Sequence, residues 1–179
     1  LPILKSIGIN YEIICVNDGS ADNTLQQLEE QQADEPSLRV IDLSRNFGKE
    51  IALTAGLDHV MGDMVLIMDA DLQHPPELIP QFMEKIAQGY DVVYGLRVNR
   101  KKTDGAGHHF LVRLFYKILD YSSEIKIPVN GGDFRLMTRQ VAEALKNLPE
   151  KKRFMKGLYA WVGFNQTPFP YEASPRNHG

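Results

Sequence analysis

Short apolar segments alternate with amphipathic helical segments along the chain, and this alternation constrains the fold more than any other feature of the sequence. Apolar runs that are rich in β-branched or aliphatic residues and bounded by polar turns predict strands at residues 12–17, 38–43, 64–69, 91–94 and 164–169. Helical spacing and N-terminal capping residues predict helices at residues 24–32, 47–61, 75–87, 108–121, 139–147 and 154–161. Strands that alternate with helices are typical of crossover units. We therefore expect an α/β fold with a mostly parallel sheet and helices on both of its faces.

Length and composition limit the class of protein. The 179 residues suit a single domain, and 43% hydrophobic and 24% charged residues are ordinary for a folded globular protein. The formal net charge of −3 argues against a nucleic-acid partner, although basic residues cluster at 97–102. No apolar run reaches the roughly 18 residues that a membrane-spanning helix needs. The single cysteine, Cys15, lies in an apolar run and is expected to be a buried thiol without a disulfide partner.

The strongest chemical signal is an apolar run, residues 65–68, that leads directly into Asp69 and Asp71. Ligands of open α/β sheets bind beyond the carboxyl ends of the strands. Two carboxylates spaced by one residue can share a divalent cation, and oxygen ligands suit Mg²⁺ or Mn²⁺. Gln73 could add an amide oxygen, and His74 could either ligate the cation or only form a hydrogen bond. The alternative is that the two acids cap the helix that is predicted to begin at residue 75.

Two further polar motifs lie near strand ends or glycines. Asp18 follows the first predicted strand and could accept a hydrogen bond from a base or ribose, and Gly19 would allow close approach of a ligand. The alternative there is a turn with a helix cap. Asp133 follows two glycines and is a candidate base, or an anion that holds the acceptor during group transfer. The alternative is an Asp–Gly turn, predicted over residues 128–132, with Asp133 paired to Arg135.

Five motifs occur in a fixed order: Asn17-Asp18-Gly19-Ser20, Arg45-Asn46-Phe47-Gly48-Lys49, Asp69-Ala70-Asp71-Leu72-Gln73-His74-Pro75-Pro76-Glu77, Gly95-Leu96-Arg97 and Gly132-Asp133-Phe134-Arg135-Leu136. Together they resemble the family-2 glycosyltransferases of the GT-A fold. The resemblance is strongest to the polyprenyl-phosphate branch, which includes dolichol-phosphate mannose synthases and bactoprenol glucosyltransferases. It extends over residues 11–179, nearly the whole chain.

The resemblance implies an inverting enzyme that transfers a hexose from a UDP- or GDP-sugar to a polyprenyl phosphate such as undecaprenyl phosphate, with Mg²⁺ or Mn²⁺ as cofactor. The residues that match the family's nucleotide-sugar site are Asp18, Lys49, Asp69 and Arg97. The matching metal ligands are Asp69, Asp71 and Gln73. The arginines that match the acceptor-phosphate site are Arg97 and Arg113. Asp133 and Asp71 match the catalytic residues, with Asp133 as the base or the acid that positions the sugar.

The resemblance also implies how the chain is organised. Residues 1–179 are expected to form one catalytic domain without the family's first nucleotide-binding strand, which nothing before Tyr11 matches, and without a carboxyl-terminal transmembrane region. The full-length protein is expected to be anchored at the cytoplasmic face of the membrane and to act in the cell envelope. The predicted helix at 108–121 is basic and amphipathic, so it either lies on the membrane surface or packs into the core.

Several alternatives stay open at this point. The enzyme could use a glycan or protein acceptor, or the chain could bind a nucleotide-sugar without turnover, and homo-oligomerisation is undecided. The only tryptophan, Trp161, follows Gly157-Leu158-Tyr159-Ala160 and therefore lacks the Gln-x-x-Arg-Trp context of polymerising relatives. A phosphatase of the haloacid class is disfavoured because Leu72-Gln73-His74 follows the acid pair.

Overall fold

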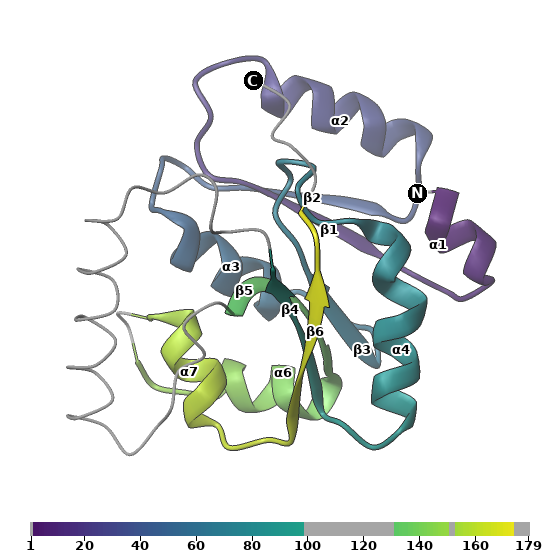
Figure 1. Cartoon of the computed structure of the whole chain (residues 1–179). Coiled ribbons are helices and arrows are strands. Elements are labelled where there is room, and N and C mark those ends of the chain that lie inside the picture. Colours follow the sequence, from purple (N-terminus) through teal and green to yellow (C-terminus); the bar gives the residue numbers. More distant parts are fainter. Residues whose placement is uncertain (1, 99–130, 151–152, 174–179) are drawn as a thin grey trace. The chain divides into compact units, whose positions relative to one another are not determined.

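The computed structural model describes residues 2–98, 131–150 and 153–173 (Figure 1). The elements in chain order are α1 (Pro2–Ile7), β1 (Ile13–Asn17), α2 (Thr24–Asp34), β2 (Leu38–Asp42), α3 (Lys49–Asp58), β3 (Met64–Ile67), the 3-10 helix η1 (Pro76–Leu78), α4 (Ile79–Ala87), β4 (Val92–Arg97), β5 (Gly131–Thr138), α6 (Arg139–Lys146), α7 (Met155–Trp161) and β6 (Gln166–Tyr171). All five predicted strands are confirmed to within a few residues, as are the five predicted helices that fall in these ranges. The predicted helix at 108–121 and most of the basic cluster at 97–102 lie outside the described residues.

The chain divides into two compact units, Leu1–Asp63 with Ala142–Phe154, and Met64–Val141 with Met155–Gly179. In the first unit β1 and β2 pair in parallel, with Ile13 opposite Leu38 and Asn17 opposite Asp42. Helix α2 makes the crossover between these two strands. Helix α3 packs closely on β1, because a Cβ atom at Gly56 would lie 3.4 Å from Cγ2 of Val16.

The second unit contains a four-stranded sheet in the order β3-β5-β4-β6. Strands β4 and β6 are parallel, whereas β5 runs antiparallel to both of its neighbours. The α/β class is confirmed, but two of the four described strand pairings are antiparallel. The source of this difference is β5, which was not predicted. The turn expected over residues 128–132 is corrected in part, since Gly131 and Gly132 belong to that strand.

Helices cover both faces of this sheet. Side chains alternate between the faces of a strand. Phe134 of β5 packs against Phe82 of α4, with ring centroids 4.9 Å apart. The next residue, Arg135, lies on the opposite face, with its guanidinium carbon 3.4 Å from the ring centroid of Tyr159 in α7. The predicted placement of helices on both faces is therefore confirmed for this sheet.

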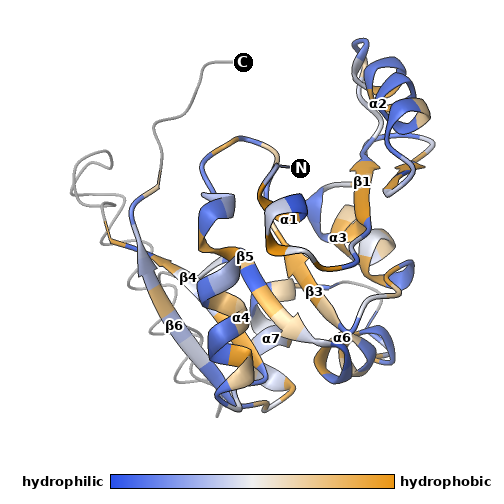
Figure 2. Cartoon of the chain, turned by 90° about the vertical axis from the view of Figure 1, so that its right-hand side faces the viewer, coloured by the Kyte–Doolittle hydropathy of each residue, from blue (hydrophilic) through white to orange (hydrophobic). Residues whose placement is uncertain are grey.

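The core of the second unit lies between β5 and α4. Phe82, Phe134 and Val93 are fully buried, and Leu136 and Tyr171 join them. In Figure 2, α4 carries hydrophobic residues on one side and hydrophilic residues on the other, as expected of a helix with one face against a sheet. Burial of each large apolar side chain in this core stabilises the folded state by roughly 1.5–3 kcal/mol. This packing fixes β5, the strand that carries Asp133.

No helix within the described ranges is long and apolar enough to cross a lipid bilayer.

Candidate active site

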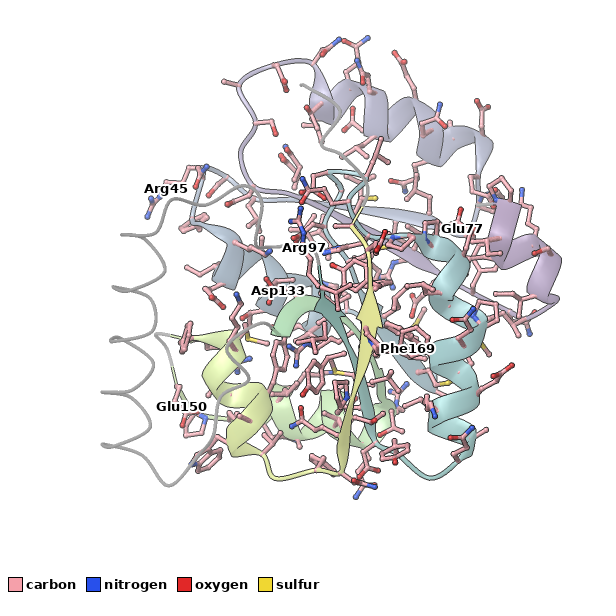
Figure 3. The ribbon with its side chains drawn as sticks, viewed as in Figure 1. Arg45, Glu77, Arg97, Asp133, Glu150 and Phe169 are labelled. Carbon is pink, nitrogen blue, oxygen red and sulfur yellow. The ribbon has the colours of Figure 1, made fainter. Side chains whose placement is uncertain are left out.

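One edge of the four-stranded sheet gathers the polar residues that the motifs predicted. Because β5 is antiparallel to β3 and β4, its amino end lies beside their carboxyl ends. Asp69 follows β3, Arg97 ends β4, and Asp133 lies near the start of β5. Tyr171 ends β6 directly opposite Arg97. Figure 3 shows Arg97 and Asp133 at these strand ends.

The acid loop, residues 69–74, is tied to β4 by a chain of hydrogen bonds. The Gln73 backbone N–H donates to Oδ1 of Asp71 at 3.1 Å. The side-chain Oε1 of Gln73 accepts a hydrogen bond from Arg97 at 3.2 Å. Leu72, between the two, has a positive φ of 61°, a conformation that non-glycine residues rarely adopt. These hydrogen bonds hold Asp71 and Gln73 in a tight turn and connect that turn to Arg97 at the end of β4.

The donor atoms of this loop fit a hard cation. Asp69 and Asp71 contribute two carboxylates to this loop and Gln73 contributes an amide, whose oxygen accepts a hydrogen bond from Arg97. Oxygen donors of this kind suit Mg²⁺ or Mn²⁺. No group of three or more His, Cys, Asp or Glu side chains positioned for a metal occurs in the described part of the chain. Mg²⁺ is typically bound through one or two carboxylates, with its remaining ligands from water and substrate phosphates. Against the helix-capping alternative, the N-cap residue of η1 is Pro75, and this helix has no side-chain cap hydrogen bond.

His74 closes the acid loop. Its Nδ1 accepts a hydrogen bond from the Asp69 backbone N–H at 2.9 Å. Its ring stacks on Phe134, with centroids 4.9 Å apart and planes inclined by 8°, and meets Tyr171 edge-on at 6.2 Å. The sequence left open whether His74 ligates the cation or only forms a hydrogen bond. In the structure, its Nδ1 forms the hydrogen bond.

Tyr171 is a residue of this edge that motif reasoning did not assign to the site. Burial raises the pKa of its phenol, the Arg97 charge lowers that pKa, and Asp69 and Asp71 raise it further. Its ring crosses Gly95, where a Cβ atom would lie only 2.7 Å from Cε1 of Tyr171. In the sequence, Tyr171 lies just past a predicted strand.

Asp133 lies on the same face of β5 as Arg135, and both are buried. Arg135 donates a hydrogen bond to the Gly132 carbonyl at 2.8 Å. Burial lowers the pKa of the Arg135 guanidinium, while the nearby Tyr159, Asp133 and Tyr94 raise it. The electrostatic attraction expected between Asp133 and Arg135 is thus present, but in a strand and not in a turn. Asp133 remains a candidate for positioning a substrate, since its strand brings it to the polar edge of the sheet.

In the first unit, Asp18 binds the loop that precedes α3. Its Oδ1 accepts the Phe47 backbone N–H at 2.7 Å, and its Oδ2 accepts the Gly48 backbone N–H at 2.8 Å. Lys49 follows this loop and is exposed at the first residue of α3. The loop that Asp18 binds therefore leads directly into Lys49. Contact of Asp18 with a nucleobase stays a prediction.

Asn17 joins the carboxyl ends of β1 and β2 and is only 4% exposed. Its Nδ2 donates to Oδ1 of Asp42 at 2.7 Å, and its Oδ1 accepts the Ser20 hydroxyl at 2.6 Å. It is a scaffold residue that the sequence motif included without assigning it a role. Arg113 and the basic residues at 100–102 lie outside the described residues.

Comparisons with known proteins agree on one family. The sequence matches the family model described as glycosyl transferase family 2 over residues 3–146. It is 50% identical to an uncharacterized glycosyltransferase of Synechocystis sp., over 100% of this chain and 56% of that protein. It is 44% identical to the bactoprenol glucosyl transferase of Shigella phage SfX, over 94% of this chain and 55% of that protein. The chain thus spans about half the length of the curated relatives it matches.

Solved structures share the fold. A mannosyltransferase from Pyrobaculum calidifontis in complex with GDP-Man and Mn²⁺ has a TM-score of 0.60 at 21% identity, covering 89% of this chain and 45% of that one. Glucosyl-3-phosphoglycerate synthase from Mycobacterium tuberculosis, in complex with Mn²⁺, UDP and phosphoglyceric acid, has a TM-score of 0.54 at 20% identity, covering 94% and 61%. At these identities the likeness concerns the fold alone.

Proposed function

Because the chain belongs to glycosyl transferase family 2, we propose that it is the catalytic part of an inverting enzyme that transfers a hexose from a UDP- or GDP-sugar to a polyprenyl phosphate. The observation that carries the proposal is the polar sheet edge, where the acid loop, Arg97 and Asp133 meet. The acceptor class is supported by the similarity to bactoprenol glucosyl transferases over 94% of the chain. The full-length protein would act at the cytoplasmic face of a membrane, where such a lipid is accessible.

The acid loop would hold the diphosphate end of the donor. Asp71, with Asp69 and Gln73, would bind Mg²⁺ or Mn²⁺. When bound, the cation supplies positive charge that offsets the charge on the departing nucleoside diphosphate. Arg97 is suited to the same phosphates, because a guanidinium presents a planar fork of donors. One terminal nitrogen of Arg97 donates a hydrogen bond to Gln73. The buried Nε of Arg97 has no hydrogen-bond partner among the described residues.

The first unit would contribute to nucleotide binding. Asp18 holds the backbone of residues 47 and 48, so its removal would disturb the loop whether or not it also contacts a base. Lys49 is exposed directly after this loop and offers a positive charge for a phosphate. The roles of both residues toward the donor are part of the proposal.

The chemistry suits a phosphate acceptor. A lipid phosphate is already ionised at neutral pH, so one of its oxygens can attack the anomeric carbon without a base to remove a proton. The new bond forms between that oxygen and the anomeric carbon as the bond from this carbon to the diphosphate breaks, with inversion. Asp133 would orient the sugar or the acceptor, and Arg97 with Arg113 would hold the acceptor phosphate. Orientation of this kind is a large part of catalysis when no proton transfer is needed.

The test is transfer of labelled sugar by the full-length protein. The protein is incubated with Mn²⁺, undecaprenyl phosphate and each of a panel of radiolabelled UDP- and GDP-sugars, and the products are partitioned between organic solvent and water. We expect label in the organic phase with one donor, and none when undecaprenol replaces its phosphate. Label only in water-soluble glycan or protein would instead establish the other acceptor class. Binding of donor without transfer to any acceptor would contradict an enzymatic role.

Asp71→Asn is the informative variant in this assay. Loss of one carboxylate charge at the cation should lower turnover by about 100–1000-fold, the usual cost of removing one such electrostatic contact. Asp63→Asn is the matched control, because Asp63 is an exposed acid just before the amino end of β3. Circular dichroism should show the wild-type fold for both variants. Full activity of Asp71→Asn would contradict the assignment of this loop as the metal site.

A further inference from the structure

We infer that His74 is a positioning residue. It sets the geometry of the acid loop but does not itself bind the cation through Nδ1. The inference rests on the proposed function, because it concerns the loop that carries Asp69 and Asp71. It is drawn from three features of His74: the hydrogen bond at Nδ1, the ring packing and the burial of the side chain. Each of these acts on a different part of the loop.

The hydrogen bond defines the tautomer of His74. The donor is the backbone N–H of Asp69, so Nδ1 of His74 must be the unprotonated acceptor in this contact. In the neutral ring the proton is then on Nε2. The bond spans from the first to the last residue of the loop and closes it at 2.9 Å. The Nδ1 lone pair is therefore engaged by the backbone and is not available to a cation.

The ring of His74 is held on the sheet by aromatic neighbours. It lies nearly parallel to Phe134, at 4.9 Å and 8°, and its edge contacts Tyr171. Phe134 is fully buried and is the next residue after Asp133 in β5. The same side chain therefore connects the acid loop to the strand that carries the candidate acceptor-positioning acid.

The acid loop needs a stabilising contact of this kind because its backbone is strained. Leu72 has a φ of 61° and is 67% exposed, so its own side chain gives the turn little packing. Backbone strain of this kind costs about 1–3 kcal/mol and persists only where neighbouring contacts hold it. His74, at 8% exposure, is the buried residue of the loop and supplies that contact.

Two substitutions separate the hydrogen bond from the packing. His74→Phe keeps an aromatic ring on Phe134 and removes the acceptor. His74→Asn removes the ring but keeps an acceptor, since Oδ1 of asparagine is the same number of bonds from Cα as Nδ1 of histidine. If His74 acts by accepting the Asp69 N–H, His74→Phe should be the more damaging change at the loop. If it only fills space, His74→Asn should be the more damaging one.

The first measurement needs no metal. Hydrogen exchange of the Asp69 amide is followed by NMR in the wild-type chain and in both variants, and the long-range nitrogen shifts of His74 report its tautomer. We expect a slowly exchanging Asp69 amide and an Nε2-protonated ring in the wild type. His74→Phe should exchange this amide at least about tenfold faster, with His74→Asn intermediate. A wild-type amide that exchanges as fast as in His74→Phe would overturn the inference.

The second measurement is the affinity for Mn²⁺ in the presence of UDP or GDP, by titration calorimetry. Residues that orient metal ligands typically contribute about 10–100-fold to affinity, so we expect a loss of that size in His74→Phe, partly restored in His74→Asn. His74→Phe with wild-type affinity would overturn the positioning role. A wild-type chain that binds neither nucleotide with Mn²⁺ would instead overturn the proposed function. The exchange of the Asp69 amide would still test the hydrogen bond to His74.

Discussion

Asp18 and Gly19 together fix the loop that precedes α3. Both carboxylate oxygens of Asp18 accept backbone N–H groups of that loop. Gly19 has a φ of 63°, and a Cβ atom there would lie 2.3 Å from the carbonyl carbon of Arg45. The two backbones thus touch at this point, and the acid can reach the loop only because its neighbour lacks a side chain.

Gly19→Ala is therefore expected to destabilise the chain by roughly 2–4 kcal/mol, from the left-handed conformation together with the backbone clash. Gly8→Ala is the matched control, because Gly8 has a similar φ of 73° but no atom within 4 Å of its Cβ position. That variant should lose only about 1–2 kcal/mol, the cost of the left-handed conformation alone. The measurement is urea unfolding followed by circular dichroism. Equal losses in the two variants would show that the contact with Arg45 does not matter.

Strand β5 is the element that organises the second unit, and it is also the element that motif reasoning failed to predict. Gly131 and Gly132 followed by an acid are typical of a turn. The strand is nevertheless buried on both faces at residues 133–137, so the polar Asp133 and Arg135 are buried although they alternate with apolar Phe134 and Leu136 as in a half-exposed strand. Its Arg135 is accommodated by the ring of Tyr159, which is distant in sequence. Local patterning could not reveal either fact.

The approach of β6 to β4 gives a test at the level of elements. A Cβ atom at Gly95 in β4 would lie 2.7 Å from Cε1 of Tyr171 and 2.9 Å from Cδ1 of Phe134. Both rings belong to the packed core, so neither can move away freely. Gly95→Ala should cost about 1–3 kcal/mol of folding free energy, and it should also displace the aromatic rings that contact His74.

Gly56→Ala is the corresponding control in α3. Its Cβ atom would make an ordinary contact, 3.4 Å from Cγ2 of Val16, and alanine favours a helix interior over glycine by about 1 kcal/mol. This variant should therefore unfold at the same or a higher urea concentration than the wild type. A gain in stability from Gly95→Ala would contradict the close packing of β4 against Tyr171.

At the scale of the whole molecule, the strand ends that carry Asp18, Asp69 and Asp71 could be predicted from local motifs, because each motif follows its own apolar run. The contacts that these residues make across the fold could not. Arg97 meets Tyr171 through the pairing of β4 with β6, and Asp18 reaches Gly48 across 30 residues. Such contacts depend on how strands pair, which single-segment patterns do not determine. The motif residues of the candidate site could therefore be predicted, whereas the contacts that strand pairing creates between them could not.

Linkage between binding and folding gives a test of the site that needs no acceptor or turnover. A ligand that binds only the folded state at about 100 times its Kd raises the free energy of unfolding by about 2.7 kcal/mol. For a chain of this size that corresponds to roughly 5–10 °C in Tm. We expect such a shift when Mn²⁺ and UDP or GDP are added together, and a smaller one when either is added alone. Thermal unfolding monitored by circular dichroism measures it.

The Asp variants make this test specific to the acid loop. Asp71→Asn should unfold near the wild-type Tm without ligands, since an amide can still accept the Gln73 N–H that Asp71 accepts. It should lose most of the additional shift that Mn²⁺ gives with the nucleotide, because the cation then lacks a carboxylate. Asp63→Asn should keep the full shift, as that acid lies before the other end of β3. An equal Mn²⁺-dependent shift in all three proteins would mean that the cation binds away from this loop.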